Sequence, residues 1–437
     1  GFGLVSELQS ILKSARLSKI FWVGAVCEKL EGLPITQFQS KSEVITHLTN
    51  NKYQDLFFIV KGARQFQFEE IIDVLELKQH TTRVEVNLSQ LIQNLGYYKS
   101  LLKPITKMMV MVKAFAYGTG MVEVAKLLEM NQVDYLAVAY ADEGVLLRQN
   151  GVKIPIMVMN VTEDDYGNLV TFDLEPEVYS LDQFRYFSNK PANLKYHLKL
   201  DTGMHRLGFE EKVLTELLAF IKANTQLKIV SVFTHLASSE RFVDNVFTEQ
   251  QITTFKLMAT KIQKVCKSNL LQHVLNSSGI ERFAHHQLDM VRLGIGLYGF
   301  GSIEGSKTEQ VIALKTNISQ IKELKATETV GYNRNGRLDK DFKIATIPIG
   351  YADGFDRRFS NGVGEVLING KEAKVIGNVC MDMSMVDVTA IDCKAGDDVV
   401  VYGENLTVDK QAKKIGTISY ELLTHLSERV RRVFYFE

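Results

Sequence analysis

Residues 109–120 read MVMVKAFAYGTG. The apolar run 108–112 predicts a buried strand, and it leads directly into Lys113, which aromatic residues and glycines follow. Burial lowers the pKa of a lysine and makes its amine a usable nucleophile for a Schiff base with an aldehyde. The structural alternative is a lysine whose ammonium group reaches solvent from the strand end. The segment therefore predicts a strand that ends at a candidate catalytic amine.

Seven further apolar runs follow, and helical patterns separate them. The runs lie at 134–138, 154–159, 177–179, 196–200, 229–233, 272–275 and 290–293. Helices are expected between them, for example at 122–130, 141–149, 212–222 and 248–267. Eight strands that alternate with helices are typical of a (β/α)8 barrel, the TIM-barrel fold. We therefore expect an α/β protein in which residues 81–315 form such a barrel.

The pattern changes on both sides of the barrel. Beyond residue 315, strand patterns with Gly and Asp turns follow one another closely, at 317–324, 342–349, 364–368, 374–376, 385–388 and 398–402, before a helical pattern at 419–430. Residues 316–437 are therefore expected to form a mainly β C-terminal domain. Residues 1–80 have apolar runs at 20–24 and 56–60 and helical patterns at 42–48 and 68–77, which predict a small N-terminal α/β segment.

The composition narrows the possible partners. The 437 residues carry 51 Lys and Arg against 51 Asp and Glu, so a zero net charge gives no general attraction to nucleic acid or anionic lipid. No apolar run approaches the ~18 residues of a membrane span. Cys27, Cys266, Cys380 and Cys393 form no CxxC pair, which predicts neither a zinc cluster nor a disulfide framework and favours a reducing, cytoplasmic setting.

Reactive side chains follow the fifth and sixth predicted strands, at the edge where a parallel barrel places its active site. Lys199 and Arg206 belong to a cation-rich turn after the fifth strand. Arg206 could bind a carboxylate through two hydrogen bonds, and ordinary ion pairs around a helix-capping Asp201 are the alternative. His235 follows the sixth strand, where a hydrogen-bonded core histidine is the more common arrangement.

Small and polar residues follow the last two predicted strands. These are the runs Asn276-Ser277-Ser278-Gly279 and Arg292-Leu293-Gly294-Ile295-Gly296. Many barrels bind phosphate at this place, because hydroxyl groups and backbone amides converge there. A phosphate site and a lysine amine in one barrel mouth together suggest pyridoxal 5′-phosphate, which requires both.

These residues and their order resemble the alanine racemase family of fold-type III pyridoxal-phosphate enzymes. The resemblance covers roughly residues 83–437. It rests on the runs Val112-Lys113-Ala114, Tyr117-Gly118, 201–208, Asn276-Ser277, 294–299, 349–354 and Cys380-Met381-Asp382. One such motif would carry little weight, but their joint order and spacing make coincidence improbable.

The resemblance implies that Lys113 carries the cofactor and is one of two acid/base groups. Tyr332 matches the second group, which acts from the opposite face of the substrate and comes from the partner subunit. Two groups are needed because racemisation removes a proton from one face of the α-carbon and delivers one to the other. A tyrosine normally titrates at about 10, and in the family His235 is hydrogen-bonded nearby, with Arg292 beyond it.

The same resemblance assigns the binding residues. Arg292 faces the pyridine nitrogen, and a guanidinium has only donors, so it disfavours protonation there and restrains transamination. Arg206 binds the substrate carboxylate, and Lys199 matches a lysine that is carbamylated in some relatives. The remaining cofactor contacts come from Tyr117, His235, Asn276, Ser277, Gly294, Ile295 and Tyr420, and Tyr351, Met381 and Asp382 contribute to substrate binding. Many relatives carry Arg before the Cys-Met-Asp motif, whereas the run here is Gly377-Asn378-Val379-Cys380, which leaves fine specificity open.

Residues 1–80 resemble a different family. The runs 21–24, 40–43 and 56–64, followed by Phe68-Glu69-Glu70, are similar to the end of a Mur ligase C-terminal domain, closest to the ligase that adds D-alanyl-D-alanine to the muramoyl peptide. No GxxxxGK[ST] loop is present, so the piece is not expected to be a working ligase alone. Residue 1 is Gly, and we expect a fragment of a ligase–racemase fusion. An ordinary N-terminal extension is the alternative.

The expected function is therefore alanine racemisation by a homodimer with shared sites, which supplies D-alanine for peptidoglycan. A fold-type III amino-acid decarboxylase and a racemase of broader specificity are alternatives. A non-enzymatic pyridoxal-phosphate homeostasis protein is another, although that class lacks the β domain expected at 316–437. No metal ion, membrane or nucleic acid is expected among the partners.

Overall fold

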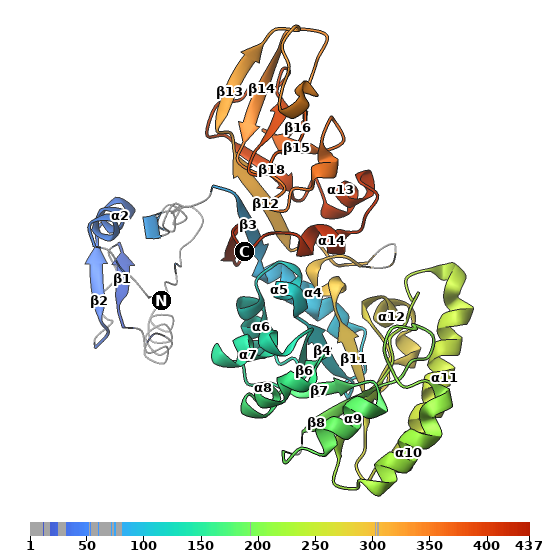
Figure 1. Cartoon of the computed structure of the whole chain (residues 1–437). Helices are drawn as coiled ribbons and strands as arrows, with labels where there is room; N and C mark the ends of the chain where they lie inside the picture. The colour runs from blue at the N-terminus through green and yellow to red at the C-terminus, as the bar shows by residue number, and fades with distance from the viewer. Residues whose placement is uncertain are drawn as a thin grey trace. The chain divides into compact units, whose positions relative to one another are not determined.

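The computed structural model describes residues 12, 18–24, 32–51, 53, 60, 71, 74–75, 81–192, 194–301, 303 and 306–437. It divides into two compact units, 1–81 and 82–437, each of which is described by itself (Figure 1). Most residues of the predicted segments 56–60 and 68–77 lie outside the described residues, as does Cys27. No helix among the residues described is long and apolar enough to cross a membrane.

A parallel eight-stranded barrel forms the larger part of the second unit, and all eight predicted strands are confirmed (Figure 1). The strands follow the order β10-β9-β8-β7-β6-β5-β4-β11. Their bounds are β4 Lys107–Met111, β5 Tyr135–Val138, β6 Ile156–Val158, β7 Glu175–Val178, β8 Lys195–Lys199, β9 Lys228–Phe233, β10 Leu271–His273 and β11 Met290–Leu293. Their side chains are mostly buried, which explains why the runs are apolar rather than alternating.

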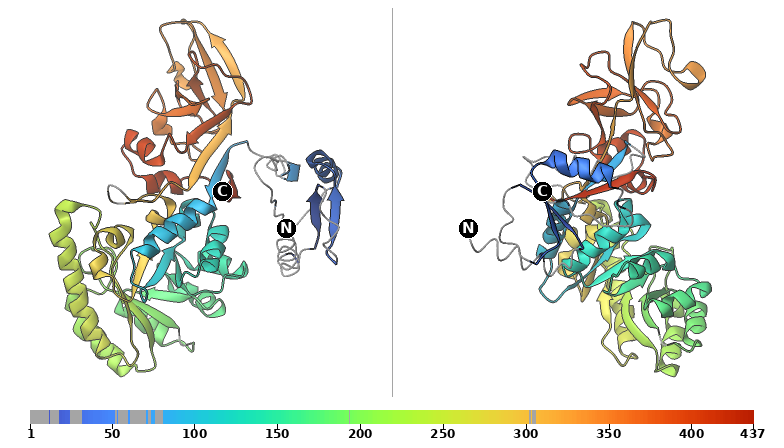
Figure 2. Two further views of the ribbon diagram at one scale, coloured as in Figure 1. Left: turned by 180° about the vertical axis from the view of Figure 1, so that it is seen from behind. Right: turned by 90° about the vertical axis from the view of Figure 1, so that its left-hand side faces the viewer.

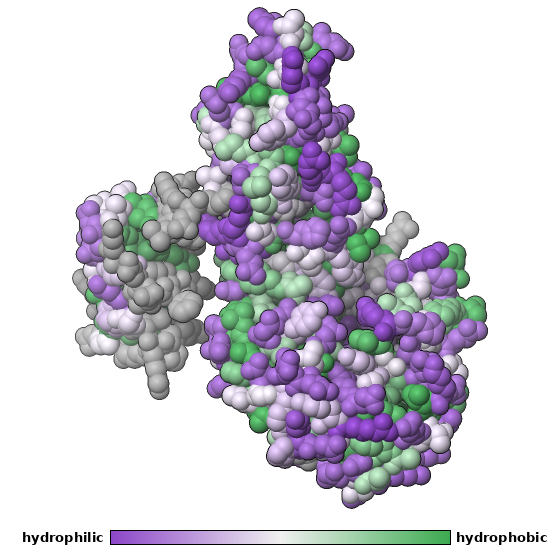
Figure 3. Space-filling view, viewed as in Figure 1, coloured by the Kyte–Doolittle hydropathy of each residue, from purple (hydrophilic) through white to green (hydrophobic). Residues whose placement is uncertain are grey.

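Helices connect the barrel strands. They are α4 Leu88–Ser100, α5 Lys113–Tyr117, α6 Met121–Met130, α7 Ala141–Gln149, α8 Tyr166–Thr171, α9 Leu181–Ser188, α10 Leu214–Ala223, α11 Asn245–Gln263 and α12 Ser277–Arg282. Short polar residues start several of them, for example Asn87, whose side chain accepts from the amide of Gln90 at 3.0 Å. Figure 3 shows hydrophilic and hydrophobic residues interspersed over the visible face of this unit.

The β domain stands at one end of the barrel and contains two sheets (Figure 2). The six-stranded sheet has the order β16-β15-β18-β12-β3-β19, and the three-stranded sheet has the order β13-β14-β17. The bounds are β3 Arg83–Asn87, β12 Ile312–Asn317, β13 Gln320–Leu324, β14 Phe342–Ile347, β15 Glu365–Ile368, β16 Lys371–Lys374, β17 Ser384–Asp387, β18 Asp398–Tyr402 and β19 Arg431–Tyr435. The helices are α13 Val408–Lys414 and α14 Ser419–Thr424.

Two features of this domain differ from the sequence-based expectation. The helix expected at 419–430 ends at Thr424, and β19 follows it. The strand β3 lies in the range 81–315 that was expected to form the barrel, yet it pairs with β12 and β19 in the six-stranded sheet. β3 and β19 are short, and their partners in the sheet are distant in sequence, so the local pattern does not determine where they pair.

The first unit has a parallel pair of strands, β1 Ile20–Val23 and β2 Ile35–Phe38, and the helix α2 Lys41–Asn50. Ser40 caps the helix by accepting from the amide of Glu43. Phe38, Val44, Leu48 and Ile71 form its buried cluster. The described part is therefore an α/β arrangement.

Candidate active site

Lys113 lies at the end of β4, where the chain enters an unusual turn. Ala114, Phe115, Ala116 and Tyr117 all adopt left-handed conformations, with φ between 52° and 55°. Such conformations cost L-amino acids roughly 1–2 kcal/mol each. Gly118 ends the turn at φ 81°, and a Cβ there would lie 2.1 Å from the carbonyl oxygen of Leu423 in α14. The turn is therefore held by its surroundings rather than by local preference.

Glu143, at the start of α7, supplies part of that support. One of its carboxylate oxygens accepts from the amide of Ala114 at 2.7 Å. The other accepts from the amides of Ala139 at 2.6 Å and Tyr140 at 3.3 Å. The carboxylate thus ties the turn after β4 to the end of β5 through charge-assisted hydrogen bonds. Glu143 is not among the residues expected from the sequence, although its place just after the second predicted strand was a signal.

The environment of Lys113 favours its neutral amine. Burial lowers the pKa of Lys113, and the positive charges of Arg206 and Lys199 lower it further, against Glu143 and Glu177. These groups come from different strand ends of the barrel, so the structure brings Lys113, Arg206 and Lys199 into one electrostatic environment. Arg206 itself is exposed. A partly buried amine is suited to react with an aldehyde, and a guanidinium beside it is suited to bind the carboxylate of a substrate.

Lys199 forms a buried ion pair at the end of β8. Its Nζ lies 2.8 Å from Oε1 of Glu177 in β7, and both side chains are buried. Burial raises the pKa of Glu177, against the positive charges of Lys199, Arg292 and Arg206. Oε2 of Glu177 is buried and has no hydrogen-bond partner. A carbamate on Lys199 would place a second negative charge beside this carboxylate.

Arg292, in β11, donates from both Nη atoms to groups in or just after β9 and β10. Nη1 lies 2.9 Å from Nδ1 of His273 and donates to the His273 carbonyl at 3.1 Å. Nη2 donates to the carbonyls of Thr234 at 2.6 Å and Val274 at 3.2 Å. Burial lowers the pKa of Arg292 to about 10, so the guanidinium remains charged at neutral pH.

His235 lies just after β9 and is neutral at physiological pH. Burial, followed by the positive charges of Arg292, Arg206, Lys199 and Lys113, lowers its pKa to about 3. A neutral imidazole can accept as well as donate a hydrogen bond. The charged groups that lower the pKa of His235 follow or end barrel strands, as expected if His235 lies at the barrel mouth.

The residues expected to bind phosphate lie close together. Ser277, at the first turn of α12, accepts from the amides of Gly294 at 2.9 Å and Gly296 at 3.3 Å. A Cβ on Gly294 would lie 3.1 Å from the hydroxyl of Tyr117 and 3.7 Å from Oγ of Ser277. The Tyr117 and Tyr420 rings are 6.0 Å apart. Asn276 caps α12 by accepting from the amide of Gly279, and Ile295 follows Gly294 in the same turn.

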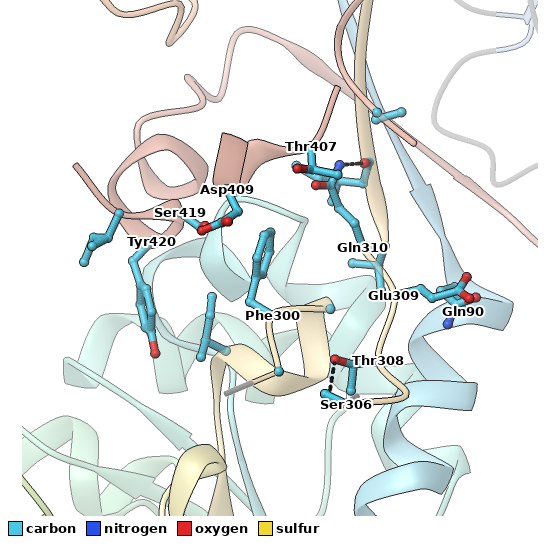
Figure 4. Close-up of a pocket in the computed structure, with 18 of the residues that line it drawn as sticks. Gln90, Phe300, Ser306, Thr308, Glu309, Gln310, Thr407, Asp409, Ser419 and Tyr420 are labelled. Atoms are coloured by element: carbon cyan, nitrogen blue, oxygen red, sulfur yellow. Dashed lines mark hydrogen bonds between the residues drawn. The ribbon is translucent and has the colours of Figure 1, made fainter. Parts of the chain in front are cut away.

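A pocket lies between these barrel residues and the β domain (Figure 4). His235, Asn276, Ile295 and Tyr420 line it, together with residues of the β domain. Tyr420 extends from α14 toward the barrel in Figure 4. These four expected cofactor residues therefore border one pocket, whereas Lys113, Tyr117, Ser277, Arg292 and Gly294 do not line it.

Four other expected residues lie on the β domain. Tyr332 is 71% exposed, Tyr351 is 43% exposed and Met381 is 54% exposed. The loops of Tyr351 and Met381 are joined by backbone hydrogen bonds, including one from Ala352 to the carbonyl of Met381 at 3.0 Å. Asp382 forms an ion pair with Arg429 at 2.8 Å. Within one chain, the described contacts of these residues are made inside the β domain.

Comparison with known proteins adds independent information. The model of the alanine racemase N-terminal domain matches residues 86–301, and that of the alanine racemase C-terminal domain matches 311–434. The chain is 36% identical to alanine racemase 2 of Caldanaerobacter subterraneus subsp. tengcongensis over 372 residues, which cover 81% of this chain and 95% of that protein.

Solved structures agree with the sequence comparisons. Alanine racemase from Clostridium difficile has a TM-score of 0.77 and 35% identity, covering 83% of this chain and 97% of that one. Alanine racemase from Bartonella henselae with covalently bound pyridoxal phosphate has a TM-score of 0.74 and 26% identity, covering 82% and 100% of the two chains. Both similarities extend over the barrel and the β domain together.

Proposed function

The chain belongs to the alanine racemase family, and from this premise we propose how its residues interconvert L- and D-alanine. The chain is an isomerase whose cofactor is pyridoxal 5′-phosphate. The observation that carries the proposal is the partly buried Lys113, whose pKa is lowered by burial and by Arg206, at the same barrel edge as Ser277 and Gly294.

The residues of the barrel mouth fit this cofactor. The missing Cβ of Gly294 leaves room between the hydroxyls of Tyr117 and Ser277, where a phosphate group can accept hydrogen bonds. Tyr117, Ser277, Ile295 and Tyr420 would hold the phosphate, and Lys113 would hold the aldehyde carbon. When bound, the cofactor withdraws electrons from the amino acid and makes its α-hydrogen acidic.

The chain's own residues orient the substrate and move the proton. Arg206 binds the substrate carboxylate, because its guanidinium is exposed beside Lys113. Nζ of Lys113 exchanges a proton on one face of the α-carbon, since its lowered pKa makes the neutral amine available. Arg292, which stays charged at neutral pH and has only donors, would face the ring nitrogen and disfavour protonation of that nitrogen.

The second proton donor and acceptor is Tyr332 of the partner subunit. Its phenol exchanges the proton on the opposite face of the α-carbon, and His235 assists it by accepting a hydrogen bond. The exposure of Tyr332, Tyr351 and Met381 on the β domain supports this arrangement, because residues that serve their own barrel would be expected to pack against it. The active form is therefore a homodimer in which each site uses both chains.

The experiment that tests this proposal is a racemisation assay on purified protein with pyridoxal phosphate. L- and D-alanine should interconvert, and serine and basic amino acids should react more slowly. Tyr332→Phe should lose exchange of the α-proton of one enantiomer while it still binds the cofactor. Full racemase activity in that variant would contradict the two-base assignment.

Mixing two inactive variants tests the shared site. Chains with Lys113→Ala and chains with Tyr332→Phe should recover about one quarter of the native sites after random exchange of subunits, because one site of each mixed dimer is intact. Activity that stays absent in verified mixed dimers would contradict the homodimer with shared sites.

The first unit is assigned separately. The parallel strands β1 and β2 and the helix α2 support an origin in a Mur ligase C-terminal domain, in a chain that supplies D-alanine to peptidoglycan in the cytoplasm. Titration of the whole chain with D-alanyl-D-alanine, in the presence of saturating alanine, tests this assignment. Heat of binding that saturates supports it, and its absence contradicts it.

A further inference from the structure

The interior of the barrel contains a row of polar residues. Glu175 in β7, His197 in β8, Ser231 in β9, His273 in β10 and Arg292 in β11 are each at most 4% exposed. The strands β7 to β10 are consecutive in the sheet, and β11, the end strand beyond β4, contacts β10. Burying a polar group without a partner costs free energy, so the side chains must satisfy one another. The row therefore crosses half of the barrel interior.

Hydrogen bonds link the five side chains in sequence. Nδ1 of His273 lies 2.9 Å from Nη1 of Arg292, and Nε2 of His273 lies 3.0 Å from Oγ of Ser231. The same Oγ lies 2.6 Å from Nδ1 of His197. Nε2 of His197 lies 2.9 Å from Oε2 of Glu175.

The donor of each bond can be deduced from the end of the row. A guanidinium has no acceptor, so Nδ1 of His273 must accept. Burial holds the pKa of His273 well below its ordinary value, and this neutral imidazole therefore carries its proton on Nε2 and donates to Ser231. When His197 is neutral, the one hydroxyl proton of Ser231 goes to Nδ1 of that imidazole. Nε2 of His197 then donates to Glu175, and all protons point in one direction. An imidazolium at His197 would donate to Ser231 instead.

Glu175, at the other end of the row from Arg292, accepts hydrogen bonds through its carboxylate. Lys195 donates to Oε1 of Glu175 at 2.9 Å. Burial opposes ionisation of Glu175, but the hydrogen bonds from His197 and Lys195 lower its pKa overall. Glu175 is therefore an anion at neutral pH, and an anion can only accept. A chain of aligned hydrogen bonds between an anion and a cation is mutually strengthened.

The same contacts determine which donor Arg292 has left. Nη1 and Nη2 use their hydrogens on His273 and on the carbonyls of Thr234 and Val274. Among the described residues, Nε–H is the guanidinium donor without a protein acceptor. The guanidinium plane can turn only if the bond to Nδ1 of His273 breaks.

We propose that Glu175, His197, Ser231 and His273 are positioning residues, a directed relay that fixes the guanidinium of Arg292 and keeps its Nε–H available to the cofactor. The inference rests on the proposed role of Arg292 toward the ring nitrogen. A guanidinium that can turn would expose the ring nitrogen to other proton donors. The relay therefore acts on the fidelity of the reaction, by suppressing transamination, rather than on proton transfer to the substrate.

The first test uses the cofactor-free chain and does not depend on activity. Nuclear magnetic resonance of ¹⁵N-histidine-labelled protein distinguishes the two neutral tautomers, with His197→Gln and His273→Gln variants to assign the signals. Both His197 and His273 are expected as neutral Nε2–H tautomers. A proton on Nδ1 of either residue, or an imidazolium at either position, would overturn the relay while leaving the racemase assignment untouched.

The second test compares Ser231→Ala with a matched buried hydroxyl outside the relay. Thr248 in α11 is fully buried and its hydroxyl has no partner, so Thr248→Val serves as the control. The measured quantity is the ratio of pyridoxamine-phosphate formation to racemisation turnovers, which does not depend on the fraction of folded protein. Ser231→Ala should raise this ratio about tenfold, and Ser231→Thr, which retains the hydroxyl, should restore it.

An unchanged ratio in Ser231→Ala, or an equal rise in Thr248→Val, would overturn the positioning role. If the wild-type protein racemised no alanine at all, the proposed function would be wrong. The histidine tautomers measured in the cofactor-free chain would still test whether the hydrogen bonds of the relay run in the proposed direction.

Discussion

Gly118→Ala should destabilise the unit of residues 82–437, because the turn after Lys113 has no room for a methyl group. Gly118 has a φ of 81°, and a Cβ would lie 2.1 Å from the carbonyl oxygen of Leu423 and 3.1 Å from its carbon. The obstructing atoms are backbone, so α14 must move as a whole. That movement would also displace Tyr420, whose ring lies 6.0 Å from that of Tyr117.

The expected magnitude has two parts. A left-handed conformation costs an L-amino acid about 1–2 kcal/mol. Overpacking against a well-packed backbone costs about 1–3 kcal/mol. The sum, ~2–5 kcal/mol, is a large fraction of the ~5–15 kcal/mol by which most proteins are stable. Gly96→Ala is the matched control, since Gly96 lies in α4 with nothing within 4 Å of its Cβ, and should stabilise by about 0.5–1 kcal/mol.

The assay is urea unfolding of the cofactor-free chain, followed by circular dichroism. The single tryptophan, Trp22, belongs to the first unit, so its fluorescence midpoint should stay unchanged in both variants. The reasoning would be refuted if Gly118→Ala unfolded at the wild-type urea concentration, or if Gly96→Ala lost as much stability.

Three further outcomes follow from the site. Arg206→Ala removes a positive charge that helps burial to lower the pKa of Lys113, so the pKa should rise and cofactor uptake should need a higher pH; an unshifted pH profile of the uptake rate would contradict this. Glu177→Gln should destabilise the chain by ~3–5 kcal/mol in urea unfolding, because Lys199 is left buried without its carboxylate partner. The second substitution Lys199→Met should recover most of the lost stability. If it recovers none, the buried Lys199–Glu177 ion pair is not the cause of the loss. Gly294→Ala should weaken pyridoxal-phosphate binding in equilibrium dialysis, because the new methyl fills the space beside the hydroxyl of Tyr117. An unchanged affinity would contradict the phosphate site proposed at Gly294.

Much of the fold could be predicted because the barrel strands are buried on both faces. Such strands are continuous apolar runs, and all eight were recognised, including the short β7, whose start at Glu175 lay outside the expected run. β3 and β19 could not be placed, since the pairing of these short strands depends on partners far away in sequence. The last helix was extended to residue 430 because the turn between α14 and β19 contains no Gly or Pro that would end a helical pattern.

The mouth of the barrel was also predictable, because its residues follow the strands directly. The relay was not, since His197, Ser231 and His273 stand inside strands, and a single polar residue in an apolar run carries no information about its neighbours. The signal was collective: polar residues at comparable depth in adjacent strands. Glu143 was missed for another reason, because its function is to hold a backbone conformation that no sequence pattern revealed.

The pairing of β3 with β19 has a consequence for biosynthesis. β3 precedes the entire barrel and β19 follows it, yet the two strands lie side by side, and the side chain of Asn87 donates to Glu437 at 3.1 Å. In topology the barrel is an insertion within the β domain. A ribosome releases the barrel long before the six-stranded sheet can close, so one edge of β3 stays unpaired until β19 has been synthesised. Joining residues 437 and 82 by a short linker and opening the chain elsewhere would end that delay.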